Sequence, residues 1–186
     1  MATNTGTRLQ LLDGDPAVMT ELQRVLEDAP TYAERVTGAP PGKADAQSTF
    51  SILPPDKSYD DKFVFGVYDD GQMIGCVDLI RGFPQPQTAH LGLLLIAESH
   101  QRRGHGKAAY RAVEDIVRSW GACTQVRIGV VRTNAEVLQF WHALGFVATG
   151  EVKPYRYASV VSETVILIKP LDDGHQRQLV APSIGR

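Results

Sequence analysis

The N-terminal part of the chain begins with two stretches in which apolar residues repeat at helical spacing. Asp15 and Pro16 form a typical helix cap and first turn, and one helical face follows, made of Val18, Met19, Leu22, Val25 and Leu26. A second, short helix is predicted over residues 29–38, with Thr31 and Glu34 as a capping box. We therefore expect the first element of the fold to be a helix.

Residues 38–61 interrupt this periodicity. The segment is rich in Pro, Asp, Ser and Lys, and it predicts a long loop or lid with little regular structure. Loops of this length inside a compact domain are often functional, so we treat the segment as a candidate wall of a binding site.

The strands are predicted by apolar runs and by alternation. Residues 62–80 read as a hairpin that turns at residues 69–71, Asp-Asp-Gly. Residues 89–97 are almost uniformly apolar, which indicates a strand covered on both faces, and residues 125–131 have the same character. Residues 146–171 predict two closing strands joined by a turn.

Two later helices lie between these strands. The first follows Gly104 and ends at Gly121, and its apolar face is formed by Ala109, Ala112, Val113, Ile116, Val117 and Trp120. The second, over residues 132–145, has Thr133 and Glu136 as a capping box. The order of elements predicts an α/β (α+β) fold, with a mixed sheet covered by helices on both faces.

Composition narrows the class of protein. The chain has 186 residues, 43% of them apolar, and a net charge of −2, which offers no basic face for nucleic acid. No apolar run approaches the roughly 20 residues that span a membrane, and the N-terminus lacks a signal-peptide core. Cys76 and Cys123 form no CxxC motif. We expect a cytoplasmic protein with free thiols, with one domain over residues 1–171 and a polar tail over residues 172–186.

The candidate chemistry begins at the turn before the third helix. Gly104 and Gly106 open this helix directly after an apolar strand. A helix N-terminus offers free N–H groups and partial positive charge, and glycines let an anion approach the backbone. The turn lacks the spacing of a P-loop or of a dinucleotide fold. It predicts a diphosphate cradle, or else a tight turn with solvated charges; the added donors and charges are Gln101, Arg102, Arg103 and Lys107.

The same residues carry a resemblance to a known family. Gln101, Gly104 and Gly106 match, in order, the Gln/Arg-x-x-Gly-x-Gly/Ala signature of the GNAT superfamily of acyl-CoA-dependent N-acyltransferases. A second stretch resembles the family's closing motif through Asn134, Phe140, Leu144, Gly145 and Phe146. The two motifs cover about residues 89–150.

The resemblance implies a GNAT fold, a mostly antiparallel sheet whose fourth and fifth strands splay apart. The diphosphate of coenzyme A would lie on backbone amides from Arg102 to Lys107, with Gln101 at the entrance and His105 a solvent-side neighbour. The pantetheine arm would pair with the backbone of the fourth strand, at Leu94, Leu95 and Ile96. Asn134 would reach the pantetheine amides or simply cap its helix.

Trp141 departs from the family pattern. Many members have a tyrosine here that protonates the departing thiolate, and an indole N–H cannot act as an acid. Either the enzyme needs no such acid, since a thiol pKa near ~8.5 makes a tolerable leaving group, or the protein binds acyl-CoA without turnover. Trp141 also fits plain packing with Val137 and Leu144. Tyrosines that could assist are Tyr155, Tyr157 and Tyr32.

Asp78 is the charged residue of an otherwise apolar strand. A charge in such a place is usually paired or functional. It predicts either a structural ion pair, for which Arg81 is a candidate near the strand end, or a base in the acceptor cleft. Weaker candidates for the base are His90, Glu98 and Glu151. The histidines show no metal-ligand spacing, so we expect no metal.

These observations predict an N-acetyltransferase that transfers an acetyl group from acetyl-CoA to a primary amine of a small acceptor, by direct attack in a ternary complex. The acceptor would enter between the early helices, the 38–61 segment and residues 155–157. The alternatives are a non-catalytic acyl-CoA-binding or sensing module and a protein N-terminal or lysine acetyltransferase. We expect no nucleic-acid or membrane partner, and a monomer or homodimer. The sequence does not select the acceptor or the acyl length.

Overall fold

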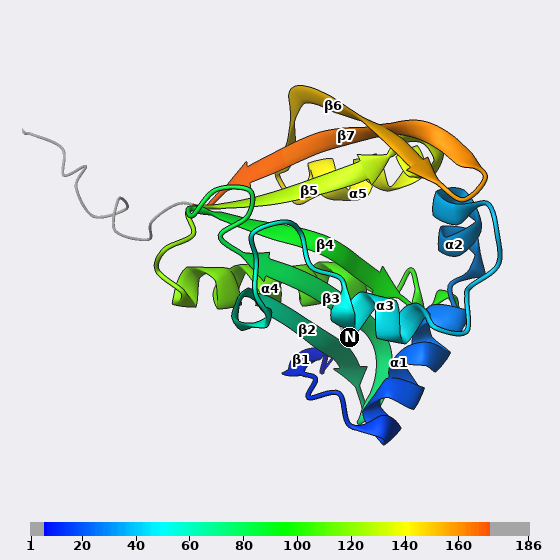
Figure 1. The fold of residues 1–186 in the computed structure, drawn as a ribbon. Helices are drawn as coiled ribbons and strands as arrows, with labels where there is room; N and C mark the ends of the chain where they lie inside the picture. Colours follow the sequence, from blue (N-terminus) through cyan, green and yellow to red (C-terminus); the bar gives the residue numbers. More distant parts are fainter. Residues whose placement is uncertain (1–5, 172–186) are drawn as a thin grey trace, which may run out of the picture.

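The structure is a computed structural model that describes residues 6–171. Its strands form one seven-stranded sheet in the order β1-β2-β3-β4-β5-β7-β6 (Figure 1). All neighbouring strands are antiparallel except β4 and β5, which are parallel. The strands are β1 (Arg8–Leu11), β2 (Lys62–Asp69), β3 (Gln72–Arg81), β4 (Thr88–Ile96), β5 (Gln125–Val131), β6 (Val147–Tyr157) and β7 (Val160–Pro170).

Helices cover both faces of this sheet, as the sequence predicted (Figure 1). Because strand residues alternate between faces, Val64 and Cys76 pack with α1, whereas Phe65 and Val77 pack with α4. One face carries α1 (Pro16–Glu27), α2 (Pro30–Thr37) and α3 (Asp45–Ser51), and the other carries α4 (His105–Ser119) and α5 (Leu138–Ala143). Short 3₁₀ helices lie at η1 (Tyr59–Asp61), η2 (Glu98–His100) and η3 (Arg132–Val137).

The N-terminal predictions are partly right. Asp15 caps α1 as expected, because its Oδ1 accepts a hydrogen bond of 2.8 Å from the Ala17 N–H. The expectation that the first element is a helix was wrong, since β1 precedes α1 and pairs with the edge of β2. The 38–61 segment is also more regular than predicted, because it contains α3 and η1.

Neither predicted capping box forms. The structural cap of α2 is Ala29, and the Thr31 N–H donates instead to Glu98 Oε1 at 2.8 Å. Residues 132–137 form η3, which has no side-chain cap, rather than the start of an α-helix. The reason is local, since Asn134 has a non-helical φ of −112° inside this segment.

The splay between β4 and β5 is present. The two strands pair only from Thr88 to His90, opposite Gln125 to Arg127. Beyond that point β4 remains paired with β3 as far as Ile96, and β5 remains paired with β7 as far as Val131. Each strand therefore follows a different partner, and a gap opens between them with α2 at its wide end (Figure 1).

The cysteines are free, as predicted, and both are buried: Cys76 is 0% exposed and Cys123 is 5% exposed. Burial raises the pKa of the Cys76 thiol to about 12. The proposed division at residue 171 stays a prediction, because residues 172–186 lie outside the described part of the chain.

An aromatic cluster joins α4 and α5 to the start of β6. The Phe146 ring lies 5.3 Å from the Tyr110 ring and 5.2 Å from the Trp141 ring, in edge-to-face contacts. Trp141 also meets Tyr110 edge-on at 5.9 Å. Such pairs stabilise a core beyond the area they bury, so this cluster holds α5 against α4.

Phe146→Ala should lower the free energy of unfolding by about 3–5 kcal/mol, because a fully buried ring is replaced by a cavity. The neighbouring Val147→Ala is the control, because Val147 is 56% exposed and its loss should cost less than about 0.5 kcal/mol. Urea unfolding of both variants measures the difference. Equal losses would show that the cluster does not stabilise the fold.

Candidate functional site

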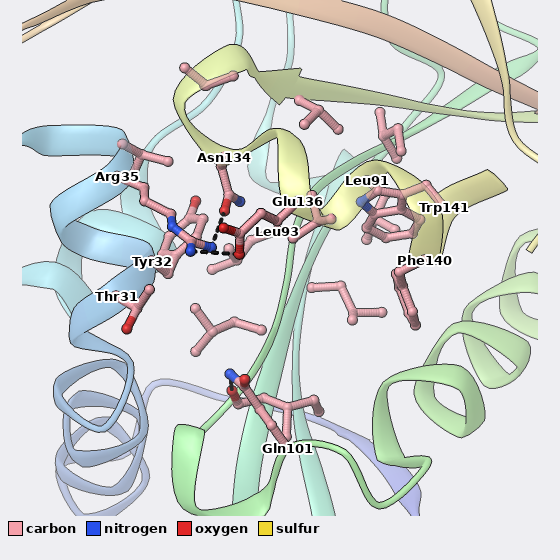
Figure 2. Close-up of a pocket in the computed structure, with 18 of the residues that line it drawn as sticks. Thr31, Tyr32, Arg35, Leu91, Leu93, Gln101, Asn134, Glu136, Phe140 and Trp141 are labelled. Atoms are coloured by element: carbon pink, nitrogen blue, oxygen red, sulfur yellow. Dashed lines mark hydrogen bonds and ion pairs between the residues drawn. The ribbon is translucent and has the colours of Figure 1, made fainter. Parts of the chain in front are cut away.

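The main cleft is the space that opens between β4 and β5, and it has a volume of about 490 Å³. Its walls are the splayed strands, α2 on one side, and η3 with α5 on the other (Figure 2). The strand residues that line it run from Leu91 to Ile96 and from Ile128 to Val131. Predicted site residues that line it are Leu94, Leu95, Ile96, Gln101, Arg102, Asn134 and Trp141.

The edge of β4 that faces the cleft has no strand partner beyond His90. Its backbone groups on that edge are therefore free to pair with an extended ligand, in the manner of an added strand. One group is already used, since Gln101 Nε2 donates to the Ile96 carbonyl at 2.8 Å. Gln101 thus ties the following turn to the end of β4 (Figure 2).

The glycine turn at the end of the cleft has the geometry of an anion site. Arg102 has a φ of +65° and Gly104 a φ of +89°, and turns of this kind gather successive N–H groups into a concave nest. In the described part of the chain, no hydrogen-bond acceptor meets the backbone N–H groups from Arg102 to Lys107. The macrodipole of α4, a helix of 15 residues, adds positive potential there.

The basic side chains of this turn are available to a ligand. Arg102, Arg103 and Lys107 are exposed, and within residues 6–171 they form no ion pair. Gly106 lies beside the Phe140 ring, which a Cβ at this position would meet at an ordinary contact distance of 3.4 Å. The turn therefore combines free backbone donors with uncompensated charge.

His105 does not lie on the solvent side of the turn, and that expectation was wrong. Its side chain is 3% exposed, and its Nδ1 lies 3.0 Å from the Thr7 hydroxyl. Its Nε2 is 3.9 Å from Asp69 Oδ2. As the first residue of α4, it points back under the sheet toward β1 and β2 and anchors the helix there.

A side-chain bridge crosses the cleft from α2 to η3 (Figure 2). Arg35 donates to Asn134 Oδ1 at 3.3 Å and to Glu136 Oε2 at 2.7 Å. Asn134 is thus not a helix cap, and its amide lies in the cleft wall. The sequence reasoning missed Arg35, because a lone arginine on a short helix carries no pattern that distinguishes it from a solvated charge.

Trp141 has both a packing and a lining role. It is 8% exposed, and besides the cluster described above it meets the Phe140 ring at 5.0 Å. It also lines the main cleft. Trp141 therefore gives the cleft an aromatic wall at this position.

Two further pockets adjoin the main cleft. The β6 pocket, of about 370 Å³, is lined by His90, Arg127, Lys153 and Tyr155 among others. The α3 pocket, of about 260 Å³, is lined by Asp45, Asp78, Tyr155 and Tyr157 among others. Tyr32 and Val36 line all three spaces. The three therefore meet at α2.

Asp78 is paired, but with Lys62 rather than with Arg81. Lys62 Nζ donates to Asp78 Oδ1 at 2.7 Å, and the Lys62 side chain is 2% exposed. Arg81 pairs with Asp61 at 3.3 Å. The reason is strand register: Val64 is directly opposite Asp78, so Lys62, two residues before it, shares the Asp78 face, and Arg81 does not.

Asp78 lines the α3 pocket, and its second oxygen is not used in the ion pair with Lys62. No donor among the described residues bonds Oδ2, which lies 3.2 Å from where a Cβ on Gly92 would stand. Gly92 is the bulge residue of β4, since Asp78 is opposite Leu93 and Leu79 is opposite Leu91. Burial raises the pKa of Asp78, and Lys62 opposes that rise. A carboxylate with a raised pKa can accept a proton.

The candidate tyrosines differ in availability. The Tyr155 hydroxyl donates to the Val36 carbonyl at 2.7 Å, which ties β6 to α2. Tyr157 is 58% exposed, and neither residue lines the main cleft. The Tyr32 hydroxyl has no hydrogen-bond partner in the described chain. Burial raises the pKa of Tyr32, so it stays protonated and acts as a donor.

The weaker candidates for the base are either poor proton acceptors or already paired with other groups. Burial and the nearby Arg127 lower the pKa of His90 to about 4, so it is neutral and a weak base. Glu98 accepts from the Thr31 N–H, and Glu151 pairs with Lys153 at 3.2 Å.

Within residues 6–171 there is no group of His, Cys, Asp or Glu side chains arranged to hold a metal ion, and no helix with the length and apolarity to cross a membrane.

Comparisons with known proteins match this geometry. The family model described as the acetyltransferase (GNAT) family matches residues 24–146, whereas no curated protein sequence matches significantly. An acetyltransferase from Thermus thermophilus superposes with a TM-score of 0.68 at 24% identity, covering 88% of this chain and 97% of that one.

Structures solved with coenzyme A also superpose. A Bacillus subtilis acetyltransferase in complex with CoA has a TM-score of 0.59 at 14% identity, over 89% of this chain and 99% of its own. An aminoglycoside 6′-N-acetyltransferase complexed with coenzyme A has a TM-score of 0.66 at 14% identity, over 89% of this chain and 98% of its own.

Gly104→Val should weaken coenzyme A binding roughly tenfold or more, the equivalent of about 1.4 kcal/mol. A β-branched residue resists a φ of +89°, so the nest would open. Gly121→Val is the matched control, because Gly121 also has a positive φ of +67° with open space around it, beyond the other end of α4. Titration calorimetry compares the two. Equal affinities in both variants would contradict the cradle.

Proposed function

Because the chain belongs to the GNAT family of acetyltransferases, we propose that it transfers an acetyl group from acetyl-CoA to the primary amine of a small acceptor, by direct attack in a ternary complex. One observation carries this proposal. The main cleft runs from an anion-binding turn along the gap between β4 and β5, and it shares Tyr32 and Val36 with two further pockets, one of them lined by the partly buried carboxylate of Asp78.

The residues of the main cleft fit coenzyme A. The nest from Arg102 to Lys107 would hold the diphosphate, and Arg102, Arg103 and Lys107 would add charge. The free edge of β4 at Leu94 and Leu95 would pair with the pantetheine amides, and Asn134 would add a side-chain partner. Two relatives of the same fold were solved with CoA, which supports this assignment.

The acceptor side is divided into two small pockets, which supports a small acceptor over a peptide. The hydrogen bond from Tyr155 to the Val36 carbonyl closes the space between the β6–β7 hairpin and α2. A peptide substrate needs an open groove, whereas these pockets have volumes of about 370 and 260 Å³. The 38–61 segment contributes α3 to this wall.

The chemistry then requires a place for one proton. The amine nitrogen attacks the thioester carbonyl and forms the new C–N bond, and Asp78 Oδ2 accepts the proton that the nitrogen loses, directly or through water. Backbone N–H groups of β4 beside the cleft would stabilise the tetrahedral oxyanion. The C–S bond breaks and the thiolate leaves.

The leaving thiolate needs no strong acid at Trp141. A thiolate is a weak enough base to leave near neutral pH without an acid, and it can then take a proton from solvent. Tyr32 lines the main cleft, and its hydroxyl has no hydrogen-bond partner among the described residues, so it could donate a hydrogen bond to the sulfur. Tyr155 and Tyr157 lie on the acceptor side and would contact the acceptor rather than the thioester.

Thiol release from acetyl-CoA over a panel of primary amines tests the proposed function. We expect amine-dependent release of one thiol per acetylated amine, with the product identified by mass spectrometry. CoA binding without release for any amine would show that the protein is an acyl-CoA-binding module instead. Release with peptides alone would contradict the small acceptor.

Asp78→Asn should lower kcat by about 10²- to 10⁴-fold, the usual contribution of a general base, without changing CoA affinity. In the native enzyme, the raised pKa of Asp78 means that activity is present above that pKa and is lost as the pH falls through it. Rates measured against pH with one fixed acceptor should show this acid-side loss, and the variant should lack it.

The control for this variant is Asp61→Asn. Asp61 is also paired with cations, Lys57 at 3.2 Å and Arg81 at 3.3 Å, but it lines none of the three spaces. Both variants should lose stability, since each leaves a cation unpaired. Normal turnover in Asp78→Asn together with a lower melting temperature would show that Asp78 serves only the ion pair.

A further inference from the structure

The two acceptor pockets carry opposite charges. Arg127 and Lys153 line the β6 pocket, and no carboxylate lines it among the residues that the structure describes. Asp45 and Asp78 line the α3 pocket, which no Lys or Arg of residues 6–171 lines. The pockets adjoin at Tyr32, Val36 and Tyr155. A ligand that spans them meets cations at one end and carboxylates at the other, of which Asp78 is paired with Lys62.

Arg127 is an unusual cation for its depth. It is 8% exposed, and buried arginines are normally paired, because an uncompensated buried charge is costly. Its guanidinium has one hydrogen bond, to His90 Nδ1 at 3.5 Å, the outer limit for such a bond. Its ion-pair partner, Glu151, is 3.8 Å away. Most of its five donors therefore have no acceptor in the described part of the chain.

The neighbours of Arg127 do not neutralise it. His90 is uncharged at neutral pH, because burial and Arg127 itself lower its pKa to about 4. Glu151 is 47% exposed and lies closer to Lys153, at 3.2 Å. One solvent-screened carboxylate is thus shared between two cations, and the β6 pocket keeps a positive charge.

We propose that the acceptor is an amine that also carries an anionic oxygen group, a carboxylate or a phosphate, which Arg127 and Lys153 bind in the β6 pocket. A planar guanidinium with free donors matches either group in a bidentate geometry. The inference rests on the proposed function, because it places the reacting amine between Asp78 and the thioester.

The backbone geometry supports this placement. Arg127 is opposite His90 in the final β4–β5 pair before the strands separate, and Gly92, two residues further along β4, lines both the main cleft and the β6 pocket. An anionic group at Arg127 would hold the amine of a short molecule near the gap. A polycationic amine would instead bring positive charge against Arg127.

Matched amine pairs test the substrate class. Each pair is an amino acid and its decarboxylated amine, such as lysine with cadaverine and tryptophan with tryptamine, and a third arm uses phosphoethanolamine with ethanolamine. We expect kcat/KM to be roughly 10- to 100-fold higher for the anionic member of at least one pair, as expected for a charge-assisted hydrogen bond. The arm that responds distinguishes carboxylate from phosphate.

Variants of the pocket assign the effect to its residues. Arg127→Gln should raise KM for the anionic acceptor about 10- to 100-fold, with a much smaller change for the partner amine that lacks the anionic group. Arg127→Lys should restore part of the preference. Lys153→Gln, a change at a 56% exposed side chain, should reduce it without threatening the fold. Arg132→Gln is the matched control, because Arg132 lines none of the three spaces.

The outcomes separate this inference from the proposed function. Equal rates within every pair, or turnover with polycationic amines only, would overturn the anionic acceptor while the acetyltransferase activity stands. A preference that survives in Arg127→Gln and in Lys153→Gln would overturn the role of the β6 pocket. CoA binding without turnover for any pair would overturn both proposals, and the Gly104 variant would then still test the cradle.

Discussion

The separation of β4 from β5 is the constraint on which the site depends. The strands share hydrogen bonds only over Thr88–His90 and Gln125–Arg127, and then each stays with its other neighbour. A sheet that loses backbone pairing in its middle leaves N–H and C=O groups unsatisfied. The molecule tolerates this because the gap is open to solvent and ligand. The unpaired edge is therefore both a defect of the sheet and the place where an extended molecule can bind.

Contacts between the elements around this gap give the site a fixed geometry. Gln101 ties the anion-binding turn to the end of β4, the Phe146 cluster holds α5 beside α4, and Tyr155 ties β6 to α2. These contacts come from segments far apart in the sequence. They place the nest, the aromatic wall and the acceptor pockets at fixed positions relative to one another.

Much of the fold could be predicted from periodicity, and the failures have physical causes. The helices α1 and α4 and the central strands have long apolar patterns. Such a pattern arises because one face of the element is buried, so it can be recognised without knowing the tertiary contacts. Strand β1 spans only Arg8–Leu11 and is stabilised by the edge of β2, so its local sequence carries little signal. The capping boxes failed because Thr31 bonds Glu98 across the fold and Asn134 breaks the helical geometry.

Some features of the candidate site could likewise be predicted from the sequence, and others could not. The glycine turn was predictable because backbone conformation depends on residue type, and the splay followed only from the family resemblance. Side-chain partners that require tertiary contacts were not predictable. Lys62 is 16 residues from Asp78, Arg35 is 99 residues from Asn134, and the orientation of His105 depends on β1. Nothing in the sequence distinguishes Arg127 from a solvated arginine, and only its burial in the structure identifies it as a candidate binding residue.

The burial of the cysteines has a consequence for work at the bench. The chain has two cysteines, Cys76 packs between α1 and the sheet with a pKa raised to about 12, and Cys123 lies in the opposite core. Disulfide-exchange dyes and alkylating agents react with solvent-accessible thiolates. The cysteines of the native enzyme should therefore not react with such chromogenic probes. A colour change in a reaction mixture would then measure the thiol of the coenzyme A that the reaction releases.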